Sequence, residues 1–218
     1  MTVHRWNKLS QDLVFPDYFT EEMKTTFTFG AKRDANAQAV IGTLYLQGNG
    51  VPANTSEAIH WYEKSAKSGN ASAAMTLARL YVRGEHLRKD NDIAVTWYEK
   101  AAAIGDAKAM HRLGSIYAKG KIVAKDLNLA VFWFRKAAKA GDASAQLVFA
   151  LMLKDGKGVE TNFREALEWL EQALNGDLTD ENRGIALKAK RSITHHLHAS
   201  GFTLPPANIP NTKNENAA

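Results

Sequence analysis

AKAMHRLGSIYAKGKIVAKDLNLAVFWFRKAAKAGD, residues 107–142, is the stretch of sequence that decides the fold. Its characteristic residues recur every 36 positions on both sides of it. The recurring aromatic residues form a tryptophan row (Trp61, Trp97, Trp133 and Trp169) and a tyrosine row (Tyr45, Tyr81 and Tyr117). A repeat of this length predicts stacked supersecondary units that share one continuous core, to which both rows should belong.

Each 36-residue unit is predicted to form two antiparallel helices, here called helix A and helix B. In residues 71–106, small and apolar residues follow a helical spacing up to Tyr81, and Gly84 can take the left-handed conformation that ends helix A. Asp90 stands where the N-cap of helix B belongs, and Trp97 should face inward. In the last unit, Asn162 and Glu165 have the spacing of a capping box, in which the glutamate reaches back to the cap amide.

Two more helices are expected outside the repeats. One runs from about residue 20 to 32 within an N-terminal segment, 1–34, and the other lies in residues 179–201. Terminal units of repeat arrays need polar-faced caps, and these helices should supply them. Residues 202–218 contain three prolines and few apolar residues, so a flexible tail is expected there.

The recurring pattern AxAxxxLGxxYxxGxGVxxDxxxAxxWxxKAAxxGD resembles the SEL-1-like repeat, a relative of the tetratricopeptide repeat. The four units that resemble it are residues 35–70, 71–106, 107–142 and 143–178, here called repeats one to four. Repeat four departs from the pattern, with Leu153 for the tyrosine and Gln172 for the lysine. The resemblance implies an all-α, right-handed α-α superhelix, or solenoid, that serves as a scaffold or adaptor for proteins or peptides. It implies neither an enzyme nor a cofactor.

The resemblance also implies where a partner would bind. In related helical repeats, the inner, concave curve is lined by helix-A residues that do not enter the core. Alignment with those repeats places nine residues of interest there: Met75, Arg79, Arg83, Lys108, His111, Lys119, Leu147, Leu151 and Lys154. A basic groove with a few apolar contacts suits an acidic, partly hydrophobic protein or peptide.

Composition limits the other possibilities. The 218 residues contain 28 Lys and Arg against 23 Asp and Glu, and no cysteine, which excludes disulfides, thiol nucleophiles and cysteine-ligated metals. The excess charge is local, because repeat three has eight basic against two acidic residues and repeat four has three against six. No apolar run has the length of a signal peptide or a membrane span, so a cytoplasmic location without membrane contact is expected.

The residues favour some alternatives to a scaffold and disfavour others. An immunity-type protein that sequesters a toxin or effector fits the residues as well as an adaptor does. Nucleic-acid binding is disfavoured because no basic run has interleaved aromatic residues for base stacking. A β-lactam-type hydrolase is disfavoured because the cysteines of such relatives and an S-x-x-K motif are missing. His195 and His198 lie one helical turn apart, but lysine and arginine precede them and no carboxylate accompanies them, so no metal site is expected.

Overall fold

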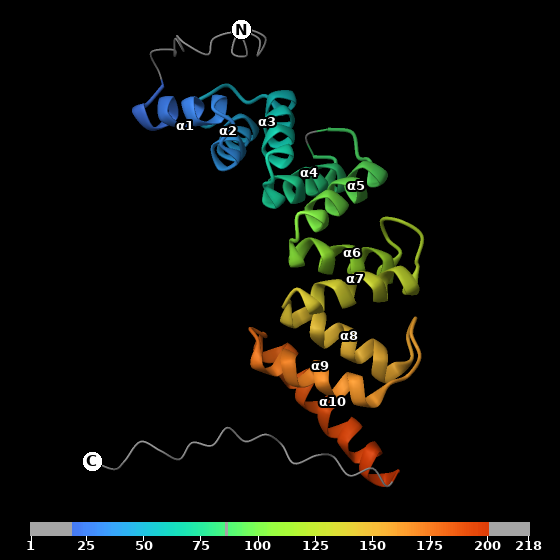
Figure 1. The fold of residues 1–218 in the computed structure, drawn as a ribbon. Helices are drawn as coiled ribbons and strands as arrows, with labels where there is room; N and C mark the ends of the chain where they lie inside the picture. The colour runs from blue at the N-terminus through green and yellow to red at the C-terminus, as the bar shows by residue number, and fades with distance from the viewer. Residues whose placement is uncertain (1–18, 86, 201–218) are drawn as a thin grey trace, which may run out of the picture.

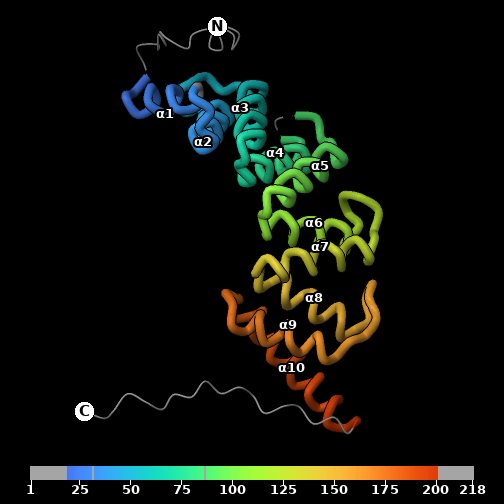
Figure 2. Tube along the Cα trace, in the orientation of Figure 1, coloured from blue at the N-terminus to red at the C-terminus, as the bar shows by residue number. Residues whose placement is uncertain are grey.

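The computed structural model describes residues 19–85 and 87–200, which form ten α-helices in one elongated, curved array (Figure 1). The helices are α1 (Glu21–Ala31), α2 (Ala35–Gln47), α3 (Thr55–Lys67), α4 (Ala71–Arg83), α5 (Asn91–Ala103), α6 (Ala107–Lys119), α7 (Leu127–Lys139), α8 (Ala143–Asp155), α9 (Phe163–Asn175) and α10 (Asp180–Ala199). The path of the chain runs from one end of the array to the other (Figure 2). The all-α solenoid is therefore confirmed, while the expected tail, 202–218, lies outside the described residues.

Each repeat contributes one pair of helices, with α2, α4, α6 and α8 as helices A and α3, α5, α7 and α9 as helices B. Side chains of aspartate or asparagine cap all eight; for example, Asp106 accepts the N–H of Ala109 at 2.7 Å. Glycines in the left-handed conformation end the four helices A, and the predicted Gly84 is one of them, with φ of 68°. The sequence signals for the start and end of these helices are confirmed.

A recurring backbone hydrogen bond fixes the turn between helix A and helix B. The N–H of the helix-B cap donates to the carbonyl of the tyrosine row or its counterpart: Asn54 to Tyr45, Asp90 to Tyr81, Asp126 to Tyr117 and Asn162 to Leu153, at 2.9 to 3.1 Å. This bond also explains why only half of the predicted capping box of repeat four forms: the Asn162 side chain accepts the Glu165 N–H at 3.1 Å, but the Glu165 carboxylate does not reach the backbone amide of Asn162. Because the cap amide is already used, the Glu165 carboxylate accepts from the Trp169 indole at 3.3 Å and from the Asn162 side-chain amide at 3.4 Å.

The core runs along the array between the two layers of helices. Small residues let the helices approach closely, since a Cβ added at Gly114 would lie 2.8 Å from the Phe134 ring. In the tryptophan row, Trp61 and Trp97 are buried, whereas the other two are half-buried. The tyrosine row (Tyr45, Tyr81 and Tyr117) is half-buried and packs at the edge of the core. The aromatic rows thus contribute to the core in graded amounts.

The two outer helices cover the ends of the repeats. α1 packs on α2, and its Phe27 ring lies 6.2 Å from the Trp61 ring. α10 packs against both α9 and α8 and buries Ala186, Ala189, Ile193 and Leu197. None of the helices in the described part of the chain combines the length and the apolar character needed to cross a membrane.

Candidate protein-interaction surface

The nine residues predicted to bind a partner lie on α4, α6 and α8, and we call their exposed part the helix-A surface. Four basic side chains on it are exposed: Arg79 and Arg83 on α4, and Lys108 and Lys119 on α6. Met75 is half-buried beside them. The helices A of two neighbouring repeats, α4 and α6, thus both present positive charge.

Some of these charges have partners and others do not. The Arg83 guanidinium lies 3.7 Å from the Glu85 carboxylate, and Arg79 donates to the Thr76 hydroxyl at 3.1 Å. Within residues 19–85 and 87–200, Arg79, Lys108 and Lys119 form no ion pair. An exposed ion pair contributes about 0–1 kcal/mol, so the Glu85 contact holds Arg83 only weakly. The helix-A surface of repeats two and three is therefore positive.

His111 is held in place by two residues of its own repeat, Phe134 on α7 and Asp142 at the N-cap of α8. Its Nδ1 lies 3.0 Å from an Asp142 carboxylate oxygen, and its ring contacts the Phe134 ring edge-on at 5.5 Å between centroids. Burial alone would raise the pKa of Asp142, but the hydrogen bonds from His111 and from the Ala145 amide outweigh it and lower this pKa. Because Asp142 also caps α8, His111 braces the junction between repeats three and four.

Repeat four contributes less to the surface than the sequence predicted. The prediction for Leu147 is wrong, because its side chain is only 3% exposed and belongs to the core. The reason is that α8 packs against α10 as well as α7 and α9, which leaves little of this helix uncovered. Leu151 is half-buried, and the Lys154 ammonium pairs with Asp155. Asp155 also binds Lys157 at 2.8 Å, and hydrogen bonds from the two lysines lower its pKa.

One recurring contact was not found by sequence reasoning. Lysines stack over the tryptophan row in three repeats, with the ammonium 4.6 Å from the Trp61 ring, 3.8 Å from Trp97 and 5.3 Å from Trp133. The lysines are Lys64, Lys100 and Lys136. The signal was present as a lysine three residues after each of these tryptophans, which places both on one helical face. Repeat four has Gln172 at this position.

The C-terminal histidines lie on α10. His195 and His198 border a shallow recess with Lys190 and Arg191, and the His196 ring lies 4.4 Å from the Phe163 ring. Across the part of the chain that the structure describes, no group of three histidine, aspartate or glutamate side chains could hold a metal ion. The surface around these histidines is basic.

Comparison with known proteins gives the same repeat boundaries. The family model described as Sel1 repeat matches residues 35–70, 71–106, 107–142 and 143–178. A Sel1 repeat protein from Oxalobacter formigenes is 31% identical with a TM-score of 0.62; the match covers 72% of this chain and 65% of that one, just under two thirds of its length.

Two further solved structures are similar at lower levels. Protein c5321, a protective antigen of uropathogenic Escherichia coli with this fold, is 25% identical with a TM-score of 0.41, over 94% of this chain and 54% of its own. Cysteine-rich protein B of Helicobacter pylori is 24% identical with a TM-score of 0.47, over 60% of this chain and 92% of its own. No curated protein matches the chain.

Proposed function

The chain belongs to the Sel1 repeat family, and from that premise we propose that it is a scaffold that binds an acidic protein or peptide on its helix-A surface. Proteins built from these repeats generally mediate protein–protein interaction, and the fold is typically non-enzymatic. The proposal adds the position and the charge of the binding surface to that general role. The proposed function requires only that the chain bind its partner, and it involves no catalysis.

The observation that carries the proposal is the set of exposed cations on α4 and α6. Arg79, Lys108 and Lys119 project from consecutive helices A without an ion pair among the described residues. Repeat three carries eight basic against two acidic residues, so the neighbouring surface does not neutralise these charges. A partner with negative charge would be attracted and oriented by this field.

The burial pattern supports repeats two and three as the binding surface. Leu147 is withdrawn into the core and Lys154 is paired, so repeat four offers only the half-buried Leu151 at its edge. Met75 supplies an apolar contact next to the exposed arginines of α4. We therefore expect a partner whose acidic side chains span α4 and α6 and whose apolar side chain reaches Met75.

The test is a joint charge reversal at Arg79, Arg83 and Lys119 to glutamate, followed by affinity capture from the native cell and mass spectrometry. These side chains are exposed, so the helical content measured by circular dichroism should not change. A matched control reverses three exposed lysines away from the helix-A surface, Lys89, Lys121 and Lys139, and changes the net charge by the same amount.

We expect the helix-A variant to lose the partners that the wild type captures, and the control variant to keep them. Equal capture by the wild type and the helix-A variant would contradict the proposal. The identity of the captured protein then separates an adaptor, which would recover members of a complex, from an immunity-type inhibitor, which would recover one toxin.

A further inference from the structure

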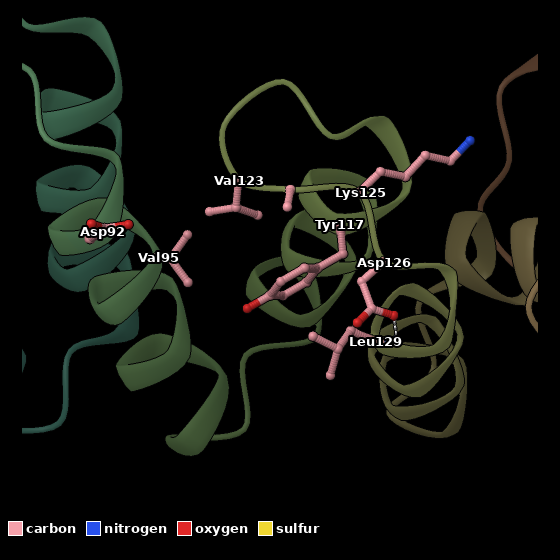
Figure 3. Close-up of a pocket in the computed structure, with 8 residues that line it drawn as sticks. Asp92, Val95, Tyr117, Val123, Lys125, Asp126 and Leu129 are labelled. Atoms are coloured by element: carbon pink, nitrogen blue, oxygen red, sulfur yellow. Dashed lines mark hydrogen bonds between the residues drawn. The ribbon is translucent and has the colours of Figure 1, made fainter.

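A second feature lies away from the helix-A surface, where α5, α7 and the loop that leads into α7 enclose a recess. Its volume is about 380 Å³ and it is open to solvent. Figure 3 shows the side chains of Val95, Tyr117, Val123 and Leu129 converging on this space from α5, α6, the loop and α7. Lys125 borders the recess but its side chain extends away from it (Figure 3). The recess is therefore lined mostly by apolar groups, with the Tyr117 hydroxyl as a polar group among them.

The loop beside the recess differs from its counterpart in repeat four. In repeat four, Gly158 has φ of 71°, and a Cβ added to it would lie 2.6 Å from the Leu127 carbonyl oxygen, so the loop lies directly against the start of α7. Repeat three has Ile122 at this register, and its side chain does not allow the same approach. Instead, the Ile122 carbonyl accepts a hydrogen bond from the Asn91 side-chain amide at 2.9 Å. The loop of repeat three is thus tied to the start of α5 and forms one side of the recess.

The wall of the recess is apolar at a register where repeats one and four are charged. At the register of Leu129, repeats one and four have Glu57 and Glu165, whereas repeat two has Ile93. Leu129 is 40% exposed, and Phe132, one helical turn further along α7, is 47% exposed. A polar residue fits this register, so the exposed leucine is not required by the repeat. An exposed apolar strip that continues a recess is typical of a surface that binds a partner.

The rim of the recess is negative. The carboxylates of Asp92 and Asp126 lie at the starts of α5 and α7, and Asp126 accepts the Leu129 N–H at 2.9 Å. Burial raises the pKa of Tyr117, and the negative charges of Glu99 and Asp126 raise it further. The charged residues that line the recess, Asp92, Asp126 and Lys125, therefore include more carboxylates than ammonium groups, whereas the helix-A surface of repeats two and three is cationic.

We propose that this recess is a second docking point, which takes an apolar side chain from a protein segment that carries adjacent lysine or arginine residues. The interior accepts the apolar side chain of such a segment, and the carboxylates of the rim attract its lysine or arginine residues. Ligand pockets have volumes of about 300 Å³ or more. The recess, at about 380 Å³, is close to that lower limit and suits one or two side chains of a peptide. The proposal is independent of the acidic partner proposed for the helix-A surface.

The test uses synthetic peptides as probes, followed by ¹H–¹⁵N NMR of the full chain. The first is the acetylated and amidated peptide Lys-Lys-Leu-Leu-Lys-Lys. Two matched controls replace either all its lysines by glutamate or both leucines by serine. We expect saturable shifts at the amides of Val95, Val123 and Leu129 with the first peptide only. Absence of saturable shifts there, or equal affinity for either control, would overturn the proposal.

Two substitutions separate the apolar and electrostatic contributions. Leu129→Gln places a polar residue where repeats one and four already have glutamate, and Asp92→Ser copies the serine of repeat one, so both variants should fold. We expect Leu129→Gln to weaken binding of the first peptide about fivefold and Asp92→Ser by about twofold. Ile185→Gln, at an exposed residue of α10, is the control and should leave binding unchanged. Unchanged affinity in Leu129→Gln would contradict a site at this recess.

Discussion

Repeats three and four are shaped by the same hydrogen bonds but differ in the surface that they leave exposed. In each, the cap of helix B donates to helix A at 3.0 Å, through Asp126 in one and Asn162 in the other. Repeat three exposes Lys108 and Lys119, whereas repeat four buries Leu147 under the additional packing of α10 on α8. The repeat motif therefore fixes the fold of each unit, and its place in the array decides how much binding surface remains.

The largest expected effect concerns the tryptophan row, which differs between the middle and the end of the array. Trp97 is 6% exposed, whereas Trp169 is half-buried. Trp97→Ala should lower the free energy of unfolding by about 3–5 kcal/mol, because it removes a buried indole and leaves a cavity. Trp169→Ala should have a smaller effect. Urea denaturation followed by circular dichroism measures both, and equal losses would contradict the graded burial of this row.

The next largest loss of stability is expected where the loop of repeat four contacts α7. Gly158→Ala should lower the free energy of unfolding by about 2–3 kcal/mol, because the new Cβ meets the Leu127 carbonyl and the backbone is left-handed. Gly141→Ala is the matched control, since Gly141 has φ of 87° but nothing within 4 Å of an added Cβ. Its loss should reflect backbone strain alone, about 1–2 kcal/mol. If Gly158→Ala is no worse than the control, the loop does not pack as described.

A smaller effect concerns acid stability at the junction of repeats three and four. The pKa of Asp142 is lowered in the folded state, so its contribution is present above the unfolded pKa of about 3.9 and is lost as pH falls through the folded value. Asp142→Asn should lower the free energy of unfolding by about 1 kcal/mol at pH 6 and flatten its fall toward pH 3.

Asp106 provides the comparison for that experiment. It caps α6 in the same way, but Met75 stands in the register of His111, so no histidine among the described residues pairs with Asp106. Urea denaturation across this pH range should show a smaller change in acid dependence for Asp106→Asn than for Asp142→Asn. The same acid dependence in both variants would remove His111 from the explanation.

The smallest effect is expected from a substitution that makes repeat four more like the other three repeats. Gln172→Lys restores the lysine that stacks on tryptophan in repeats one to three. Because both side chains are partly exposed, we expect a gain of only about 0.5 kcal/mol in the free energy of unfolding. Thermal denaturation would detect this as a small rise in the midpoint, and a fall would show that Trp169 cannot accept the cation.

Much of the fold could be predicted because each helix of the repeats carries its own start and stop signals. Asp90 and Gly84 act within a few residues of the chain, and local signals of this kind survive without knowledge of the tertiary structure. The missing half of the capping box, from the Glu165 carboxylate to the cap amide, shows the limit of such reasoning. The cap amide of Asn162 was already bound to Leu153, a residue that the fold brings back from the preceding helix.

The surface was less predictable because exposure depends on neighbouring elements. Leu147 occupies the same register as Met75 and His111, and only the packing of α10 against α8 distinguishes this helix from its counterparts. The recess beside Leu129 was missed for the same reason, since it lies where a loop meets the start of the preceding helix B. A comparison of Ile122 with Gly158 was the available signal, but it acquires meaning only when the contact with Leu127 is known.

The affinity of the captured partner for three forms of the protein would decide whether the helix-A surface of repeats two and three is the binding site. Isothermal titration at low and high salt should show binding that weakens with salt in the wild type and in the Lys89, Lys121 and Lys139 reversal control. The joint reversal at Arg79, Arg83 and Lys119 should weaken binding by about tenfold or more at low salt and remove most of the salt dependence. Equal affinities for the two triple variants would show that the partner binds elsewhere.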